Sequence, residues 1–363
     1  MPDNDILLDV QHLTKSFVAE SNLFGKPTSF VQAVDDVSFQ IKRGEAFGLV
    51  GESGCGKTTI GKMLVGLIRP TAGEIVFDGR NITRLSEKDR RALCKDIQLI
   101  FQDPYASLNP RMTIGNIIAE PIRTNNLMPA DQVDDRVAEL LECVGLASYM
   151  RNRYPHEFSG GQRQRVGIAR ALAVNPKLIV CDEPVSALDV SVQAQVLNLL
   201  DDLKDEFGLT YLFIAHGLNV VKHISNRVGV MYLGKMMEVA EKNDLYHHPL
   251  CPYSQALLSA IPSVDPKLRR RRIILEGDVP SPIDPPPGCR FASRCFTNIG
   301  ACDVSAPKLE EVIPGHWCAC HHYDGVSDDK VYDVSHEIEL ASARPSYGRD
   351  AADGSSGARG LPE

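Results

Sequence analysis

The sequence lacks the features that would place it inside a membrane, outside the cell or on nucleic acid. No apolar run approaches the ~18 uninterrupted residues that a membrane-spanning helix needs, so we expect no membrane span. The start of the chain, Met1 to Asp5, lacks the basic-then-apolar layout of a secretory signal. A formal net charge of −8 gives no basic excess, which argues against a nucleic-acid binder. Any membrane role is therefore expected to come through partner proteins.

Internal repeats are also lacking, and the 363 residues are enough for one large domain and a smaller one. A hydrophobic fraction of 43% is ordinary and allows a sizeable core. Short apolar runs alternate with helical patterns and occupy residues 46–50, 177–182, 210–216 and 227–233. Such runs are typical of buried strands, so the sequence predicts an α/β fold whose largely parallel sheet is covered on both faces.

Changes in composition and in hydrophobic pattern divide the chain into segments. Helical patterns from residue 103 to about 175 follow a break rich in Pro and Asn, and they predict a mainly helical insertion. Residues 261–288 contain seven prolines and the basic run Lys267 to Arg272, and we interpret them as the boundary of a small module over residues 261–323. Residues 324–363 are rich in Asp, Ser, Gly and Ala, so we expect a disordered tail.

Residues Gly51 to Thr58 form a G-x-x-x-x-G-K-S/T pattern, the signature of a phosphate-binding loop. An apolar run precedes the pattern and a segment with helical spacing follows it, as this loop requires. Gly51, Gly54 and Gly56 permit backbone angles that turn loop N–H groups toward phosphate. Lys57 is expected to reach the β- and γ-phosphates of a nucleotide, and the Thr58 hydroxyl to bind Mg²⁺. The alternative is a glycine turn that fits the pattern by chance.

Two further segments carry groups that a phosphate loop needs. An apolar run over residues 178–181 ends in Asp182, which can hold Mg²⁺ through water, and Glu183, which can polarise the attacking water. Ser159 precedes two glycines and opens a helix predicted over residues 162–174, so it offers a second anion-binding helix end. Taken alone, each segment also fits an ordinary strand end or a linker.

Together these motifs resemble the ATP-binding cassette ATPases. The phosphate loop, Gln102, Ser159-Gly-Gly-Gln162, Asp182-Glu183, Ser186-Ala-Leu-Asp189 and His216 occur in the order that this family has. The resemblance implies a cassette domain over residues 5–260, with a mostly parallel sheet, an antiparallel β part and a helical subdomain at about residues 103–175. It also implies an ATPase that binds ATP and Mg²⁺.

The resemblance implies a role for each matching residue. Glu183 matches the general base, His216 the switch histidine at the γ-phosphate, and Gln102 the glutamine that senses Mg²⁺ and the attacking water. Mg²⁺ would be bound through Thr58, Gln102 and Asp182. The full nucleotide-binding set is Phe17, Gly51, Ser53, Gly54, Gly56, Lys57, Thr58, Thr59, Gln102, Ser159, Gly160, Gly161, Gln162, Asp182 and Asp189.

Three positions qualify the match. Phe17 stands where the family stacks an aromatic ring on adenine, and the alternative is a core phenylalanine near a strand end. Gly217 follows His216 where the family usually has aspartate, and Asn226 stands where it often has aspartate. Neither change removes a group that contacts phosphate. Glycine at position 217 is nevertheless expected to add backbone freedom to the histidine loop.

The chain has one phosphate loop and one signature, Ser159 to Gln162, which lie apart within a chain of this family. The resemblance therefore implies two ATPase subunits packed head to tail around two ATP molecules, with Asp189 linking the two sites. Closure on ATP would move two membrane permease subunits docked on the helical insertion, served by an extracytoplasmic binding protein. This would place the chain at the cytoplasmic face of the cell membrane. The alternative is a soluble cassette ATPase of the DNA-repair or translation type.

The ten cysteines fall into two groups. One group is scattered, and we interpret most of its members as core residues or bystanders. In a chain that is not exported, the crowded C-terminal group indicates a metal site more than disulfides. The scattered cysteines are Cys55, Cys94, Cys143, Cys181 and Cys251, and the crowded ones are Cys289, Cys295, Cys302, Cys318 and Cys320.

The pattern from Gly288 to Cys320 resembles the C-terminal extension of oligopeptide and dipeptide importer ATPases. The stretches Phe101 to Pro110 and His248 to Tyr253 also look like this subfamily, and the connection from Ala19 to Val31 resembles the second of its two paired ATPases. The resemblance implies import of peptides and a partner ATPase that is a paralogue. Related importers take nickel, opines or sugars, and a second copy of this chain is the alternative partner.

Several thiolates brought together suit a 4Fe–4S cluster or Zn²⁺. The spacing has no close C-x-x-C pair, which weakens a zinc-ribbon interpretation, and members of the subfamily can carry an iron–sulfur cluster here. The resemblance assigns the ligands to Cys289, Cys295, Cys302 and Cys320, with Cys318 as the alternative to Cys320. A set of reduced, metal-free cysteines is the remaining alternative, although so short a module would then lack the metal or disulfide cross-link that stabilises small domains.

Overall fold

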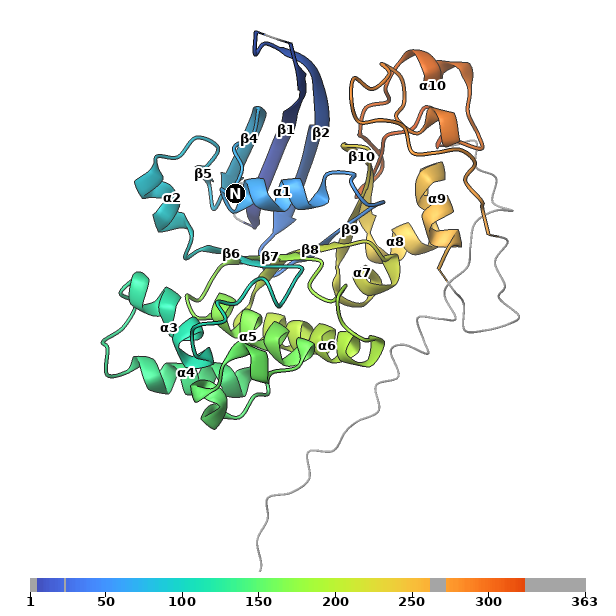
Figure 1. Cartoon of the computed structure of the whole chain (residues 1–363). Coiled ribbons are helices and arrows are strands. Elements are labelled where there is room, and N and C mark those ends of the chain that lie inside the picture. The colour runs from blue at the N-terminus through green and yellow to red at the C-terminus, as the bar shows by residue number, and fades with distance from the viewer. Residues whose placement is uncertain (1–4, 23, 262–271, 324–363) are drawn as a thin grey trace, which may run out of the picture.

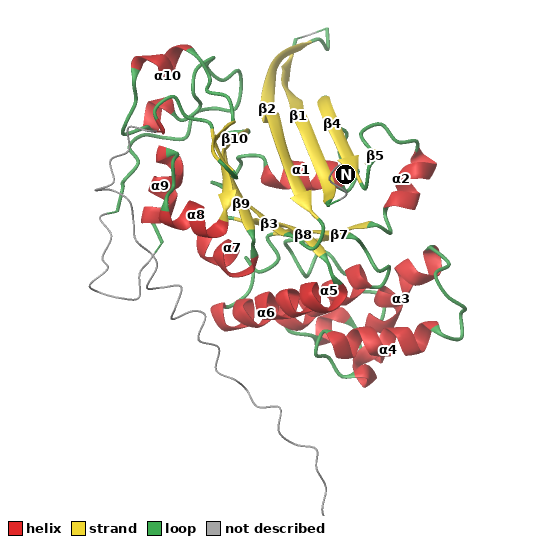
Figure 2. Cartoon of the chain, turned by 180° about the vertical axis from the view of Figure 1, so that it is seen from behind, coloured by secondary structure: helices red, strands yellow, loops and turns green. Residues whose placement is uncertain are grey.

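The structure is a computed structural model that describes residues 5–22, 24–261 and 272–323. Figure 1 and Figure 2 show its layers, in which an antiparallel sheet, helix α1 (Lys57–Leu64), a larger central sheet and a group of helices follow one another. The C-terminal segments, orange and red in Figure 1, lie beside strand β10 (Lys235–Glu241) at one edge of the central sheet. The fold is the α/β class that the sequence predicts.

The central sheet has eight strands in the order β11-β12-β10-β9-β3-β8-β7-β6. The five strands from β9 to β6 run parallel, and the other three are antiparallel to their neighbours. The predicted buried runs form β3, β7, β8 and β9. The strands span Ala46–Val50 (β3), Ile97–Ile100 (β6), Leu178–Asp182 (β7), Thr210–Ala215 (β8), Arg227–Tyr232 (β9), Lys235–Glu241 (β10), Glu310–Ile313 (β11) and His316–Cys318 (β12).

A second sheet has four antiparallel strands in the order β2-β1-β4-β5. Its first two strands extend into the segment from Ala19 to Val31, which the sequence predicts to be a connection. Glu20 there pairs with Ser29, and Ser21 pairs with Pro27. The strands span Ile6–Ser21 (β1), Pro27–Lys42 (β2), Ala72–Phe77 (β4) and Arg80–Asn81 (β5).

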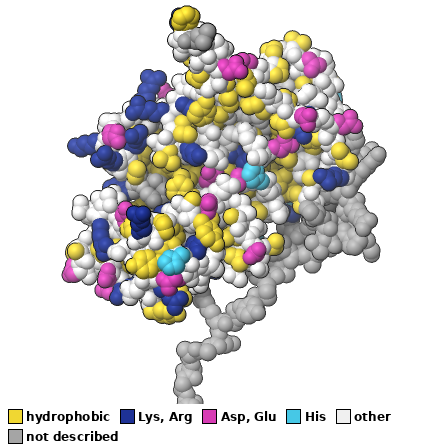
Figure 3. Space-filling view, viewed as in Figure 1, with side chains coloured by type: hydrophobic (Ala, Val, Ile, Leu, Met, Phe, Trp, Pro, Cys, Tyr) yellow, Lys and Arg dark blue, Asp and Glu magenta, His cyan; other side chains and the backbone are white. Residues whose placement is uncertain are grey.

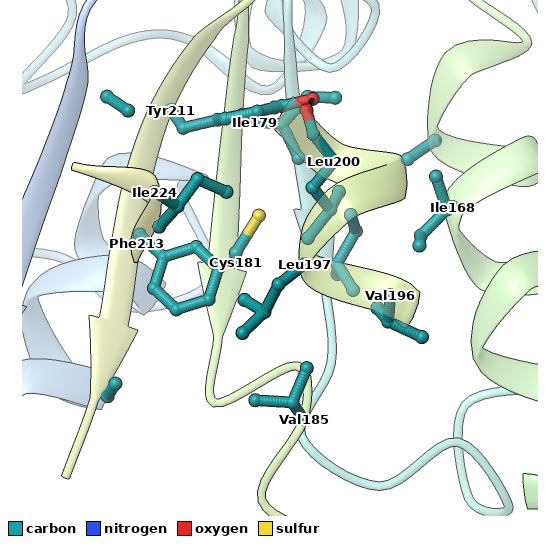
Figure 4. Close-up of a cluster of buried hydrophobic side chains, with 14 of the residues drawn as sticks. Ile168, Ile179, Cys181, Val185, Val196, Leu197, Leu200, Tyr211, Phe213 and Ile224 are labelled. Atoms are coloured by element: carbon teal, nitrogen blue, oxygen red, sulfur yellow. Dashed lines mark hydrogen bonds between the residues drawn. The ribbon is translucent and has the colours of Figure 1, made fainter. Parts of the chain in front are cut away.

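Side chains that alternate along the central strands form two hydrophobic cores. Phe47 and Leu49 of β3 belong to the core around α1 and the antiparallel sheet, whereas Val50 belongs to the core on the opposite face. Figure 4 shows part of this second core, where Cys181 of β7 lies beside Leu197 of helix α6 (Val190–Phe207). The central sheet is therefore covered on both faces. Because both faces of its strands are buried, their sequences are continuous apolar runs.

Helices fill the remaining layers. Helix α1 lies between the two sheets, and α5, α6 and α7 cover the opposite face of the central sheet (Figure 1 and Figure 2). The predicted helical insertion contains α3, α4 and α5. The helices span Lys57–Leu64 (α1), Glu87–Leu93 (α2), Ile114–Thr124 (α3), Val133–Cys143 (α4), Gly160–Leu172 (α5), Val190–Phe207 (α6), Leu218–Ile224 (α7), Lys242–His247 (α8), Pro252–Ser259 (α9) and Gly300–Val304 (α10), with 3-10 turns at Ser148–Asn152, Pro155–Glu157 and Ala292–Arg294.

The C-terminal segment continues the central sheet. Strand β12 pairs with β10, so the β11–β12 hairpin extends the sheet at its edge. Glu238 of β10 is fully buried, accepts hydrogen bonds from the backbone N–H groups of Leu250 and Cys251, and lies 2.7 Å from Nε2 of His316 in β12. The predicted module limits stay a prediction, and these contacts show that its hairpin packs as part of the central sheet.

Two predicted features fall wholly or mostly outside the described residues, namely the tail from residue 324 and the basic run from Lys267. Within the described residues, no helix is both long and apolar enough to cross a membrane. Basic side chains gather over β5 and α2 in Figure 3. Arg80 lies 3.3 Å from Asp89 there, and Arg90 lies 3.4 Å from Glu87, so this surface carries both charges.

Candidate functional site: a phosphate loop and its carboxylates

The phosphate loop connects β3 to α1, as the sequence predicts. Two of its glycines are required both by their backbone angles and by the lack of space for a side chain. The φ angle is +151° at Gly51 and +106° at Gly56, where a residue with a Cβ would be strained. A Cβ on Gly51 would lie 2.1 Å from the carbonyl oxygen of Met231, and one on Gly56 would lie 2.2 Å from that of Ala33. The loop is therefore packed between the end of β9 and the middle of β2.

Lys57 is folded back onto this loop. Its Nζ donates to the carbonyl oxygens of Gly51 at 2.7 Å and Glu52 at 3.0 Å, and the residue is only 3% exposed. The same Nζ lies 3.5 Å from Sγ of Cys55, and burial raises the pKa of that thiol. A buried ammonium at the N-terminus of α1 makes the loop a charged site for an anion, where phosphate oxygens can replace the carbonyl oxygens.

Thr58 and Asp182 meet beside the loop, although they are 124 residues apart in the sequence. The Thr58 hydroxyl donates to Oδ1 of Asp182 at 2.9 Å. Burial raises the pKa of the Asp182 carboxyl, while the hydrogen bond from Thr58 and the charges of Lys62 and Lys57 act to lower it. A hydroxyl and a carboxylate are hard oxygen ligands, so the pair fits Mg²⁺, whose charge neutralises phosphate oxygens when it is bound.

Glu183 follows β7 with both carboxylate oxygens engaged. Nε2 of Gln102 donates to Oε2 at 2.7 Å, and Nε2 of His216 lies 2.5 Å from Oε1. Glu183 is 5% exposed and has a φ of +49°, an uncommon angle that is held by its N–H donating to the carbonyl of Ile214 at 3.0 Å. The structure thus brings together the three residues that the sequence predicts to be catalytic.

The second predicted anion site begins helix α5. Ser159 Oγ accepts from the N–H of Gln162 at 3.3 Å, and Gln162 Oε1 accepts from the N–H of Ser159 at 3.0 Å, which is a reciprocal cap. Gly161 makes room for α6, because a Cβ there would lie 2.4 Å from Cγ1 of Val192. Asp189 is exposed at the start of α6. Across the described residues, no hydrogen bond or ion pair links Ser159 or Gln162 to the phosphate loop.

Phe17 lies on β1 beside the loop. It pairs in register with Val31 of β2, two residues before Ala33, whose carbonyl oxygen abuts Gly56. The side chain is 38% exposed, and Nζ of Lys15 lies 4.9 Å from the ring centroid. This exposure does not fit the alternative of a core phenylalanine and leaves the ring available for stacking.

The structure shows what the two departures from the family pattern, Gly217 and Asn226, change locally. Gly217 has a φ of −92° and begins α7 with no side-chain cap among the described residues, so an aspartate would suit the backbone angle and could cap the helix. The side chain of Asn219 would have to move, because its Oδ1 would lie 2.5 Å from the new Cβ. Asn226 Oδ1 accepts from the N–H of Ala46 at 2.9 Å and ties β9 to β3. Asparagine therefore keeps the acceptor that an aspartate would offer, whereas Gly217 leaves α7 without a cap next to His216.

A narrow cavity between α9 and the C-terminal segment is lined by five cysteines. They are Cys251, Cys289, Cys295, Cys302 and Cys320. Cys318 is buried in β12 and does not line the cavity. No three His, Cys, Asp or Glu side chains converge as ligands of a metal ion within the described ranges. The thiols therefore share a wall of one cavity without meeting at a single point.

Cys251 joins this cavity although the sequence places it among the scattered cysteines. The signal that could have found it is its position in the stretch His248 to Tyr253, which already resembles the subfamily. Burial raises the pKa of Cys289 to about 12 and that of Cys320 to about 12, and the neighbouring thiols add to both shifts. These side chains are thus neutral thiols unless a bound cation stabilises their thiolates.

Comparisons with known proteins cover both parts of the chain. The ABC transporter family model matches residues 34–186, and the family model for the oligopeptide/dipeptide transporter C-terminal region matches residues 237–302. The chain is 53% identical over 324 residues to the oligopeptide transport ATP-binding protein AppF of Bacillus subtilis, covering 88% of this chain and 98% of that protein. It is 50% identical over 324 residues to the oligopeptide transport ATP-binding protein OppF of Haemophilus influenzae, covering 88% and 97%.

A solved structure shares the cassette part of the fold. It is the dimeric, post-hydrolysis state of the ATP-binding cassette MJ0796 bound to ADP and phosphate, with a TM-score of 0.58 and 28% sequence identity. The match covers 65% of this chain and 99% of the MJ0796 chain. Fold, loop geometry and sequence relatives agree, and the chain belongs to the ABC transporter family as an ATPase subunit of the oligopeptide/dipeptide transporter branch.

Proposed function

We propose that this ATPase energises the import of peptides through a membrane permease complex. The observation that carries the ATPase part of the proposal is one site that combines a buried Lys57, the Thr58–Asp182 pair and a Glu183 held by Gln102 and His216. Relatives that span nearly the whole described chain are named oligopeptide transport ATP-binding proteins, which supports peptides as the solute class.

In this proposal each residue of the site has one task. Lys57 and the loop N–H groups bind the β- and γ-phosphates of ATP, while Thr58 and Asp182 hold Mg²⁺. Glu183 accepts a proton from the water that attacks the γ-phosphate, and Gln102 and His216 orient its carboxylate. Phe17 stacks on adenine.

The proposed working unit contains two ATPase subunits. Among the described residues, Ser159 and Gln162 hydrogen-bond each other and make no hydrogen bond or ion pair with the phosphate loop. We propose that Ser159 to Gln162 and Asp189 face the loop of a second subunit, which we propose to be a paralogue. The dimeric state in which MJ0796 was solved supports this pairing. Two permease subunits would dock on the helices that follow Gln102, with a binding protein on the other side of the membrane, so this chain would lie at its cytoplasmic face.

Peptide uptake by living cells tests the solute class. In cells whose only copy of this chain carries Lys57→Ala, uptake of a labelled oligopeptide is expected to fall to background, because the ammonium that holds the phosphates is missing. Arg80→Ala, on an exposed salt bridge, is the matched control and should take up peptide normally. Unchanged uptake in the Lys57 variant, together with turnover stimulated by nucleic acid, would favour the soluble ATPase instead.

We further propose that Cys289, Cys295, Cys302 and Cys320 hold a 4Fe–4S cluster, with Zn²⁺ as the alternative metal. Their soft sulfur donors support both metals, and their spread along the wall of one cavity suits the separate iron atoms of a cluster better than a single Zn²⁺, whose ligands must converge. A bound cluster would act as a cross-link for a segment whose own secondary structure consists of short pieces. Cys251, on the same cavity wall, is available to substitute for a ligand.

Metal analysis of protein purified without oxygen tests the cluster. We expect about four iron atoms and brown colour per chain in the wild type, with most of the iron lost in Cys302→Ser because a ligand is removed. Cys94→Ser is the matched control, since Cys94 is exposed and far from the cavity in sequence. One zinc per chain without iron would select the alternative metal, and no metal at all would contradict both assignments.

A further inference from the structure

The stretch from Cys289 to Cys295 reaches the phosphate loop. Nη1 of Arg294 lies 3.2 and 3.0 Å from the two carboxylate oxygens of Glu52, the second residue of the loop, and 3.2 Å from the hydroxyl of Tyr232. The Arg294 side chain is 10% exposed and that of Glu52 is 27% exposed. Because the pair is mostly shielded from solvent, salt screens it less than a surface ion pair.

A second contact joins the loop to helix α9. The N–H of Glu52 donates to the hydroxyl of Tyr253 at 3.1 Å. The Tyr253 ring is fully buried and lies 4.7 Å from the ring of Tyr232 and 5.2 Å from that of Phe291, centroid to centroid. Phe291 comes from the same stretch as Arg294, so the packed rings tie the position of Tyr253 to the C-terminal segment.

The contact from Tyr253 acts on the peptide group that holds Lys57. The peptide between Gly51 and Glu52 is planar and trans, so its N–H and C=O point in opposite directions. The N–H donates to Tyr253, and the C=O accepts from Nζ of Lys57 at 2.7 Å. Fixing one end of this plane fixes the other. The carbonyl of Glu52, held through its side chain by Arg294, is the second acceptor for Lys57 at 3.0 Å.

We propose that Arg294 and Tyr253 are positioning residues of the nucleotide site. Neither is proposed to touch ATP. Both hold Glu52, and through its backbone they set the shape of the phosphate loop and the position of Lys57. The C-terminal segment thereby contributes to ATP affinity, in addition to lining its own cysteine cavity. The proposal rests on the assignment of the phosphate loop as the nucleotide site.

The test compares ATP binding and turnover of full-length variants. Tyr253→Phe keeps the ring and removes only the hydroxyl, and Arg294→Ala removes the ion pair. Each is expected to raise the KM for ATP about fivefold, the low end of couplings between linked sites, with kcat within about twofold of the wild type. Calorimetric titration with ATP and Mg²⁺ should show the same loss of affinity. Arg80→Ala should change neither value.

A double-mutant cycle of Glu52 and Arg294 distinguishes a positioning role from a general loss of structure. If Arg294 acts through Glu52, the double variant Glu52→Ala with Arg294→Ala should bind ATP no more weakly than Glu52→Ala alone. Arg294→Lys, which keeps the charge but not the fork of donors, should recover part of the affinity. Additive losses in the double variant would overturn the role of Arg294.

Two results decide the remaining cases. If Arg294→Ala does not fold, Tyr253→Phe decides alone, because its packing is preserved. Wild-type affinity in Tyr253→Phe, at an unchanged unfolding temperature, would overturn the role of Tyr253. Lys57→Ala supplies the reference for a disabled loop. If the wild type bound ATP no better than Lys57→Ala, the assigned nucleotide site itself would be wrong. If the wild type and both positioning variants bound ATP equally well and better than Lys57→Ala, the nucleotide site would stand and only the positioning role would be overturned.

Discussion

Replacing Glu183 with glutamine is expected to lower ATP turnover by about 10²- to 10⁴-fold, the contribution typical of a positioned general base. Glutamine has the same shape, and its amide oxygen can still accept the hydrogen bond from Gln102. The change removes the carboxylate that takes a proton from water. ATP binding should persist, because Lys57 and Thr58 are untouched. Phosphate release and ATP titration on one preparation measure both quantities.

A matched control for this substitution is Glu74→Gln. Glu74 is exposed and, like Glu183, accepts a hydrogen bond from a side-chain amide, in this case from Asn81 at 2.9 Å. Its replacement should leave turnover at the wild-type level. If Glu183→Gln also turned over ATP at the wild-type rate, Glu183 would not be the base, and Asp182 would become the first candidate.

The strands that carry the site are the part of the fold that the sequence predicts best. Continuous apolar runs predict β3, β7, β8 and β9 to within one residue at each end. Their parallel arrangement brings Thr58, which follows β3, to Asp182 at the end of β7 and places His216 just after β8. Polar residues at the carboxyl ends of parallel strands meet at one edge of a sheet, which is why their grouping could be inferred.

Contacts between segments that are distant in sequence could not be predicted. Nothing in local pattern or propensity links Glu52 to Arg294 or Glu238 to His316, because each pair depends on how the C-terminal segment packs against β10. Cys251 is a similar case, since only the position of α9 brings it to the cysteine cavity. The full length of the β1–β2 hairpin could not be predicted either, because its polar outer half pairs without forming a buried face.

Replacing Gly56 with alanine is expected to weaken ATP binding at least about tenfold and to lower the free energy of unfolding by about 2–4 kcal/mol. A non-glycine residue is strained at a φ of +106°, and its Cβ would lie 2.2 Å from the carbonyl oxygen of Ala33. That oxygen belongs to backbone in β2, so it cannot turn aside as a side chain could. Relief requires a shift of the loop, and the N–H groups at the start of α1 move with it.

Gly79→Ala separates the strain of the angle from the clash. Gly79 has a φ of +74° in a turn outside the site, and a Cβ there would meet no atom within 4 Å. Its replacement should cost only the backbone strain, about 1 kcal/mol, and should leave ATP affinity unchanged. Chemical unfolding and ATP titration of both variants give the comparison. Equal stability of the two, with normal ATP binding in Gly56→Ala, would show that the phosphate loop is not packed against β2, and the close approach at Ala33 would be wrong.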